Sequence, residues 1–425
     1  MSRFGLELPT IQNWSCHNCG GCCKQHGIYI TDEEHDRIEK QNWTEQDGIP
    51  AGQPLFVRMG GLIGKRWWRL AHQPDGSCAF LDEKGLCRIH GKFGEEAKPL
   101  ACRIYPYAFH PAGKKVVVSL RFSCPSVVKN LGRPVKQQSA DLKGIARQIV
   151  PDNVTELPPP MVSPGTNVTW PDLQRFVAAL DETLAGEDPV VIKLLRALAW
   201  MKLVEQSRFD KIEGGRLTEY LNLICTAAEE DVPTDLTELA DTLGEPSRIG
   251  GAPFRLLVGH YARKDTYADE TGLGERWRLL RNVLRFTRGT GEIPLVQDCF
   301  GPATFESLQG PFGPIPQDAE EIFTRYFRVK VRGMHFCGRA YYGIPLIEGF
   351  YSLVLVYPAV LWLARWLATG DGRDSLTTDD IAQALAIADH HHGYSPAFGT
   401  WGFRRRVRTL AQLGDIPRLC VYYSR

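Results

Sequence analysis

The sequence has no excess of charge of either sign, because its 425 residues contain 50 lysines and arginines against 49 aspartates and glutamates. A chain that binds nucleic acid or an anionic membrane surface through its overall charge is strongly basic. We therefore expect neither nucleic acid nor a membrane among its partners. Residues 1–14 also lack a basic segment followed by an apolar run, so we expect no signal peptide and a cytoplasmic protein.

A hydrophobic run of membrane-spanning length is missing as well. The longest uncharged apolar stretch, residues 349–364, lies between Glu348 and Arg365 and contains Pro358. A spanning helix needs about 20 apolar residues in a row. We therefore predict a buried core helix for this stretch.

What the sequence does have is a concentration of cysteine near its beginning. Cys225, Cys299, Cys337 and Cys420 are widely separated, whereas the other eight of the 12 cysteines lie at or before position 124. Disulfide frameworks belong mainly to small secreted domains, and core packing does not require so dense a run. We therefore interpret eight residues as metal ligands: Cys16, Cys19, Cys22, Cys23, Cys78, Cys87, Cys102 and Cys124.

The spacing of the first cysteines bears on the identity of the metal. Cys16, Cys19 and Cys22 follow the C-x2-C-x2-C pattern of bacterial ferredoxins, which favours a [4Fe–4S] cluster. Gly20 and Gly21 allow a tight loop whose amides can approach thiolates or sulfides. Zinc also uses C-x2-C pairs, so Zn²⁺ is the alternative metal. His17, inside the run, is expected to lie exposed in the loop.

The adjacent pair Cys22–Cys23 limits how the ligands can be shared. In an extended backbone, neighbouring side chains point to opposite sides, so we expect only one of the two at a given site. Either a single cluster is accompanied by spare thiols, or the eight cysteines form two sites. The sequence leads us to favour one cluster, held by Cys16, Cys19, Cys22 and Cys102. In that case Cys23 is a spare thiol, and Cys78, Cys87 and Cys124 are alternative or second-site ligands.

Short elements are predicted around the later cysteines. Residues 78–82 and 85–89 resemble two strands joined by a turn, residues 94–104 a short helix, and residues 116–124 a strand. Arg88 and Arg103 each follow a cysteine, where a cation would stabilise a thiolate.

The rest of the chain shows mainly helical periodicity. We predict an α+β protein with a small irregular cysteine-rich domain with short hairpins at residues 12–133. A helix and a proline-rich linker follow at residues 134–170, and a mostly α-helical domain at residues 171–425. His390-His391-His392 ends a predicted amphipathic helix, where cationic histidines suit the helix dipole better than metal ligation.

These blocks resemble a known family. Cys16-x2-Cys19-x2-Cys22-Cys23 is similar to the CxxCxxCC signature of the YkgJ-like family of zinc- or iron-chelating domains. Later segments resemble the same family in the same order, namely Cys78-Ala-Phe-Leu, Gly85-Leu-Cys87-Arg-Ile and residues 98–106. The resemblance covers residues 12–130 and implies a metal site built from these cysteines.

A longer resemblance is to the flagellin lysine N-methylases, on residues 94–106, on Phe122-Ser-Cys124-Pro125 and on the aromatic-rich helical segment from Glu320 onward. It implies a protein substrate, lysine methylation and S-adenosylmethionine as cosubstrate. The first cysteine run is more tightly spaced than in those enzymes, and no glycine-rich loop of the nucleotide-fold methyltransferases is visible. The alternatives are a structural zinc module and a redox or cluster-carrying protein with a helical interaction domain.

Overall fold

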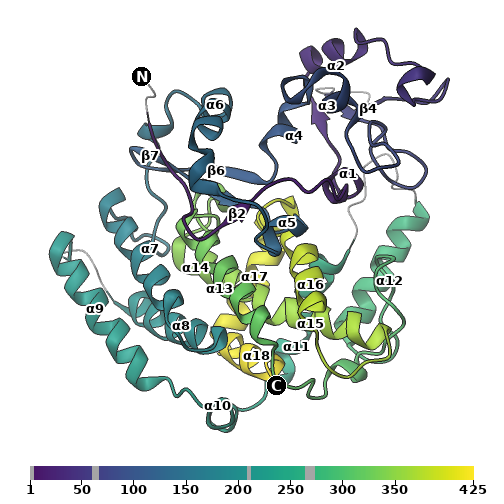
Figure 1. Ribbon diagram of the computed structural model, residues 1–425. Helices are drawn as coiled ribbons and strands as arrows, with labels where there is room; N and C mark the ends of the chain where they lie inside the picture. Colours follow the sequence, from purple (N-terminus) through teal and green to yellow (C-terminus); the bar gives the residue numbers. More distant parts are fainter. Residues whose placement is uncertain (1–3, 60–66, 208–211, 264–272) are drawn as a thin grey trace.

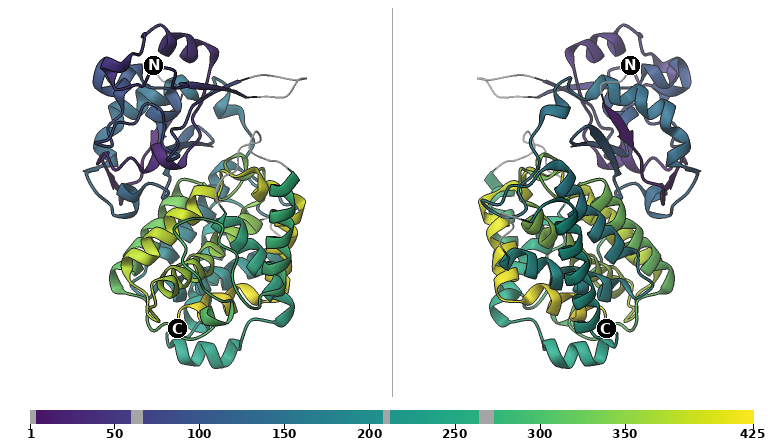
Figure 2. Two further views of the ribbon diagram at one scale, coloured as in Figure 1. Left: turned by 90° about the vertical axis from the view of Figure 1, so that its right-hand side faces the viewer. Right: turned by 90° about the vertical axis from the view of Figure 1, so that its left-hand side faces the viewer.

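The computed structural model describes residues 4–59, 67–207, 212–263 and 273–425. A smaller unit of short strands and helices, formed by the first part of the chain, lies on one end of a larger helical bundle (Figures 1 and 2). This arrangement confirms the predicted fold class, a small irregular unit with hairpins followed by a mostly helical region.

The smaller unit has its own hydrophobic core. Ile38, Phe80 and Ile89 are each almost completely buried in it, and Cys78 is part of the same cluster. Helix α2 begins with a capping box, in which Thr31 and Glu34 each accept the other's backbone N–H. The elements of this unit are α1 (Gly21–Gln25), β3 (Tyr29–Ile30), α2 (Asp32–Glu39), β4 (Phe56–Met59), β5 (Trp67–Leu70), α3 (Arg88–Phe93) and α4 (Leu100–Ile104).

A second sheet connects the smaller unit to the bundle. Strands β6 (Tyr107–Ala112) and β7 (Lys115–Leu120) form an antiparallel hairpin, and β1 (Gly5–Glu7) pairs parallel to β7. β7 is rich in β-branched valines, and its side chains from Val116 to Leu120 are buried. Val117, Val118 and Leu120 belong to the large core of the bundle. Two further strands, β2 (Asn13–Trp14) and β8 (Arg133–Pro134), pair with one another.

The bundle is built around one apolar helical segment. It consists of α14 (Leu346–Val354) and α15 (Val356–Gly370), and every residue from Leu346 to Ala368 is buried. Pro358 lies in the first turn of α15, where its missing N–H has no helical partner to lose. By length and composition the segment Leu346–Gly370 could cross a membrane, but 94% of its apolar window is buried inside the protein. Burial of this kind is typical of a core helix, as predicted.

The other helices surround this segment and pack through apolar faces. Helix α7 begins after Thr169, whose side chain accepts the Asp172 N–H, and Pro171 lies in its first turn. Helices α13 and α16 lie next to the β6–β7 hairpin and its following turn. The bounds are α5 (Pro125–Val128), α6 (Ser139–Ile149), α7 (Trp170–Ala185), α8 (Val190–Gln206), α9 (Gly214–Asp231), α10 (Leu236–Leu243), α11 (Arg248–Ala262), α12 (Leu273–Arg288), α13 (Gln317–Arg332), α16 (Thr378–His391), α17 (Trp401–Gln412) and α18 (Asp415–Tyr423).

Three local predictions around the cysteines were wrong. Residues 78–82 and 85–89 form only isolated bridges, Leu81 with Cys87 and His72 with Cys78, and α3 begins at Arg88. The segment 94–104 is not one helix, because Pro99 holds the preceding residue in an extended conformation and α4 begins after it. The strand predicted for residues 116–124 ends at Leu120, because the amides of Phe122 and Ser123 bind the Asp389 carboxylate instead of a neighbouring strand.

Candidate metal centre

The first cysteine run forms a tight loop that leads into a helix. Gly20 has a φ of 67°, a left-handed conformation that glycine adopts at little cost, and α1 begins at the next residue. Cys22 and Cys23 therefore lie on a helical turn, not on an extended backbone. Their sulfurs are 3.9 Å apart, so the expectation that they point to opposite sides was wrong.

Four cysteines from four separate segments form an inner group: Cys22, Cys78, Cys87 and Cys102. Burial raises the pKa of Cys78 to about 12, and the charges of Cys87 and Cys22 add to this. Burial also raises the pKa of Cys102 far above its usual value, with further contributions from Cys78, Cys87 and Cys22. The contact with Cys23 is the main cause of the raised pKa of Cys22, followed by burial. Because each thiolate acts on the next, the four thiols share one electrostatic environment.

Backbone hydrogen bonds bring these segments together. The Cys78 amide donates to the Cys23 carbonyl at 2.8 Å, which joins α1 to the segment before α3. The Asp82 carboxylate accepts the amides of Lys84 and Leu86 and so closes the turn between Cys78 and Cys87. The predicted turn is therefore present, although its two flanks are too short to form strands. The turn separates Cys78, which precedes it, from Cys87, which follows it.

Lys98, which the sequence did not single out, is the cation next to the inner group. Its charge partly offsets the effects that raise the pKa values of Cys22 and Cys102. Burial lowers the pKa of Lys98 itself, but Glu95 and the thiolates outweigh this and raise it overall. Arg88, predicted to stabilise a thiolate, instead donates to the carbonyls of Asp47 and Leu81. In the sequence, only the position of Lys98, four residues before Cys102, could have indicated this role.

An outer group contains Cys19 and Cys124. Burial raises the pKa of Cys124, and the charge of Cys19 raises it further. Cys19 is exposed, as is Cys16, whose sulfur lies 3.6 Å from the Asn18 side-chain oxygen. Of the expected set, Cys22 and Cys102 are therefore in the inner group, whereas Cys16 and Cys19 are exposed. One cluster with additional thiols and two separate sites both stay predictions.

A buried ion pair of the bundle holds the turn that carries Cys124. Asp389, at the end of α16, accepts the amide of Phe122, and that of Ser123 at 3.2 Å. Its other oxygen lies 2.6 Å from the ammonium of Lys330 on α13, and both side chains are completely buried. Lys330 also donates to the Leu120 carbonyl. The bundle therefore fixes where β7 ends and where Cys124 is placed, which local sequence could not reveal.

The spacing of the sulfurs tests which metal would fit. Four thiolates bound tetrahedrally to one zinc ion at 2.3 Å lie about 3.8 Å from one another. Among the described residues, no three cysteine sulfurs lie within 4.8 Å of one another. The raised pKa values mean that Cys22, Cys78 and Cys102 are protonated at neutral pH without a metal. A metal that binds them as thiolates would displace these protons. The set of thiol donors therefore fits a metal that takes cysteine ligands, such as zinc or iron.

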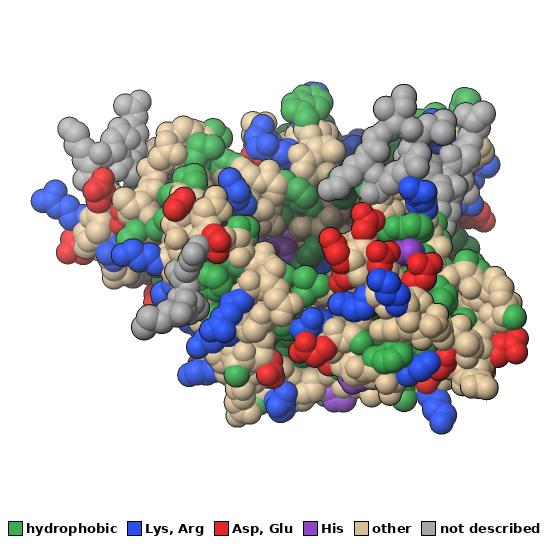
Figure 3. Space-filling model, turned by 90° about the horizontal axis from the view of Figure 1, so that it is seen from above, with side chains coloured by type: hydrophobic (Ala, Val, Ile, Leu, Met, Phe, Trp, Pro, Cys, Tyr) green, Lys and Arg blue, Asp and Glu red, His purple; other side chains and the backbone are tan. Residues whose placement is uncertain are grey.

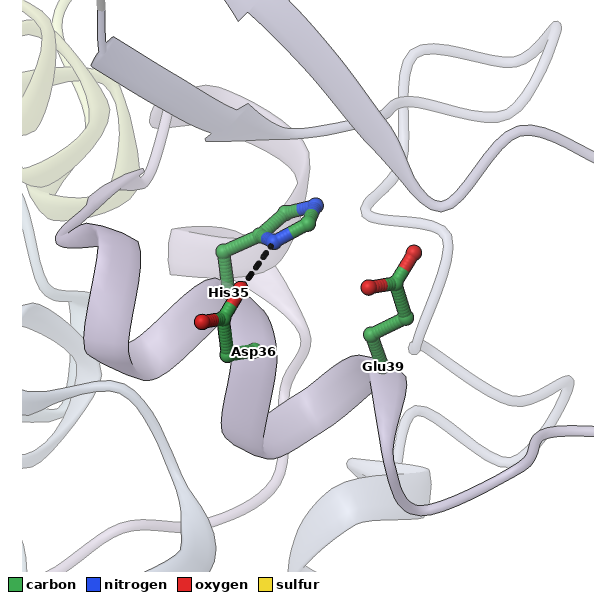
Figure 4. Close-up of side chains that lie close together, drawn as sticks. All are labelled: His35, Asp36 and Glu39. Atoms are coloured by element: carbon green, nitrogen blue, oxygen red, sulfur yellow. Dashed lines mark hydrogen bonds and ion pairs between the residues drawn. The ribbon is translucent and has the colours of Figure 1, made fainter.

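A different set of potential ligands lies on α2. His35, Asp36 and Glu39 have ligand atoms within 4.8 Å of one another (Figure 4). The two carboxylates are exposed, and the His35 ring stacks on Trp68 at 4.0 Å while its Nδ1 contacts Asp36 at 3.2 Å. These contacts account for the histidine without a metal.

The three consecutive histidines lie where α16 ends, as predicted, but not as surface cations. His391 and His392 are buried, and burial lowers the pKa of His392 far below its usual value. His392 Nδ1 instead shares a hydrogen bond of 2.8 Å with the Tyr261 hydroxyl. His392 is therefore neutral, and the proposed interaction of a charge with the helix dipole does not apply to it.

Fold and site together define a cysteine-based metal-chelating unit joined to a helical bundle. Residues 15–125 match the model of the CxxCxxCC family, described as a "putative zinc- or iron-chelating domain". A stretch of 56 residues is 36% identical to the flagellar biosynthetic protein FliU of Salmonella muenchen and covers 13% of this chain and 33% of that protein. The matched region is thus a third of that relative's length. No solved structure matches the chain.

Proposed function

We propose that the inner group, Cys22, Cys78, Cys87 and Cys102, holds an iron–sulfur cluster of the [4Fe–4S] type. The observation that carries the proposal is that the four thiols share one environment although their sulfurs are not as closely spaced as around one zinc ion. A cluster separates its cysteine ligands more widely, because irons and sulfides lie between them. The outer group, Cys19 and Cys124 with Cys16, would supply ligands for a second site, whereas Cys23 stays with the inner group because its sulfur lies 3.9 Å from that of Cys22.

Metal analysis tests this proposal. We expect the anaerobically purified chain to be brown and to contain iron and acid-labile sulfide at about four each per chain if only the inner site holds a cluster, or about eight each if both do. Iron and sulfide should be lost together on acid treatment. Stoichiometric zinc without labile sulfide would contradict the proposal and would indicate a structural zinc module instead.

A second candidate function is protein-lysine N-methylation with S-adenosylmethionine. It is supported by the resemblance to flagellin lysine N-methylases and by the 56-residue match to a flagellar biosynthetic protein. The metal-chelating unit would then be part of an enzyme.

Methyl transfer can be measured directly. We expect the full chain, incubated with methyl-labelled S-adenosylmethionine and purified flagellin, to incorporate label at lysine side chains identified by mass spectrometry. The matched control is the Cys102→Ser chain, which should lose both metal and activity. Absence of label with metal-loaded wild-type protein would contradict this function for flagellin and leave the metal-site proposal unaffected.

A further inference from the structure

Buried polar atoms without a partner are concentrated where the smaller unit meets the bundle. Among the described residues, Arg121 Nε, Tyr394 Oη, His110 Nε2 and His392 Nε2 are buried and make no hydrogen bond. Nearly all polar atoms in a protein interior are paired, so such a group indicates a missing polar partner. We call the region containing these residues the junction.

The charge of Arg121 is not neutralised within the described protein. Its guanidinium lies 3.6 Å above the Tyr394 ring and donates one hydrogen bond, to the His390 carbonyl at 3.2 Å. It forms no ion pair with a carboxylate of the described residues. The nearby Lys330 and Asp389 pair with one another. The junction therefore retains one positive charge, oriented by an aromatic ring and with most of its N–H donors unused.

The Arg121 charge is not the one that balances the cysteine thiolates. The cation that lowers the pKa of Cys22 and Cys102 is Lys98. The Arg121 charge instead partly offsets the raised pKa of Tyr105, whose ring lies 5.6 Å from the guanidinium. The charges of Cys124 and Cys22 contribute to raising that pKa. Tyr105 thus lies between the two cysteine groups and the arginine, which places the junction beside the metal centre but not in it.

Five side chains at the junction are partly exposed, although its unpartnered atoms are buried. Arg121, Tyr394, Tyr105, His26 and His390 are each half-buried. The His26 ring stacks on His390 at 4.6 Å and contacts Tyr105 at 5.0 Å, so side chains of both units meet there. Seen from above, the surface of the molecule is hollowed near the middle of the view (Figure 3).

We propose that Arg121 and Tyr394 bind an oxyanion, the carboxylate or phosphate group of a small molecule held beside the metal centre. A guanidinium can donate two parallel hydrogen bonds to either group, and the unpartnered Tyr394 hydroxyl supplies a third donor. The rings of Tyr105 and His26 form an aromatic wall against which the rest of the molecule packs. This site does not depend on the identity of the metal or on methyl transfer.

Calorimetric titration of the full metal-containing chain tests the site with two simple probes, sodium malonate and sodium phosphate, at constant ionic strength against sodium chloride. We expect saturable binding of at least one probe, and the stronger of the two identifies the group recognised. Arg121→Gln should abolish it. Tyr394→Phe should weaken it about tenfold, the effect of one hydrogen bond to a charged group.

Two further variants keep the test decisive. Arg121→Lys retains the charge but cannot form two parallel hydrogen bonds to one oxyanion. This variant should bind the probe more weakly than wild type but more tightly than Arg121→Gln. The matched control is Arg405→Gln, because Arg405 lies 5.1 Å above the Trp401 ring at the surface, and binding should not change. Circular dichroism confirms that each variant is folded. Absence of saturable binding of both probes to wild type, or equal binding by folded Arg121→Gln, would overturn the proposal.

Discussion

Replacing Cys102 with serine is expected to remove the metal from the inner group and to unfold the smaller unit while the bundle stays folded. A hydroxyl is a poor ligand for soft metals. The small core around Phe80 and Ile89 contains ten buried residues, so we expect it to depend on the free energy of metal binding, which is about 10 kcal/mol or more for structural zinc in small domains. Iron content and thermal unfolding followed by circular dichroism would measure the two effects.

Two control variants show whether the loss is specific. Cys337→Ser changes a buried cysteine of the bundle, and we expect it to keep its full metal content. Cys16→Ser changes an exposed thiol of the first run, and it should leave the inner group intact. If Cys16→Ser instead removed all metal, the ferredoxin-like grouping would be correct and the division into inner and outer groups wrong.

Replacing Asp389 with asparagine is expected to destabilise the protein by about 3–5 kcal/mol, because it leaves the fully buried Lys330 ammonium without its counter-charge. If the asparagine oxygen keeps the Phe122 and Ser123 amides, its NH2 group faces the Lys330 ammonium, so that two hydrogen-bond donors oppose one another. The turn that carries Cys124 should then be released. We therefore expect metal to be lost from the outer group, measured as iron per chain alongside urea unfolding.

A matched control separates the two consequences of this substitution. Asp181 on α7 is also buried and pairs with Arg328 and Arg332 of α13, away from the cysteines. Those arginines are partly exposed, so Asp181→Asn should cost less stability and leave the iron content unchanged. Equal iron content in Asp389→Asn and Asp181→Asn would show that the ion pair supports the fold but not Cys124.

The sequence revealed the ligand candidates better than their grouping. The density of cysteine before position 124 and the glycines at 20 and 21 are local signals, and residues 15–125 match a metal-chelating family model. Which cysteines meet depends on contacts between distant segments, such as the Cys78 amide on the Cys23 carbonyl. The helical turn at Cys22–Cys23 also violated the extended backbone assumed for them.

The fold class was predictable because helical periodicity dominates after residue 170 and short turn-rich segments precede it. The end of β7 was not, because the amides of Phe122 and Ser123 bind Asp389, which lies more than 260 residues away. Lys98 and Arg121 also carried no local signal. Each is an ordinary basic residue in the sequence, and only the tertiary structure gives it its neighbours.

The position of the β6–β7 hairpin limits how this protein could have been assembled from parts. Its sequence lies within the family match at residues 15–125, yet Val118, Leu120 and Phe122 are buried in the core of the bundle. A fragment cut at the borders of the match would expose this apolar surface to water, where it would promote aggregation. The chelating segment is therefore not an interchangeable unit in this chain, because its hairpin needs the bundle to cover its apolar face.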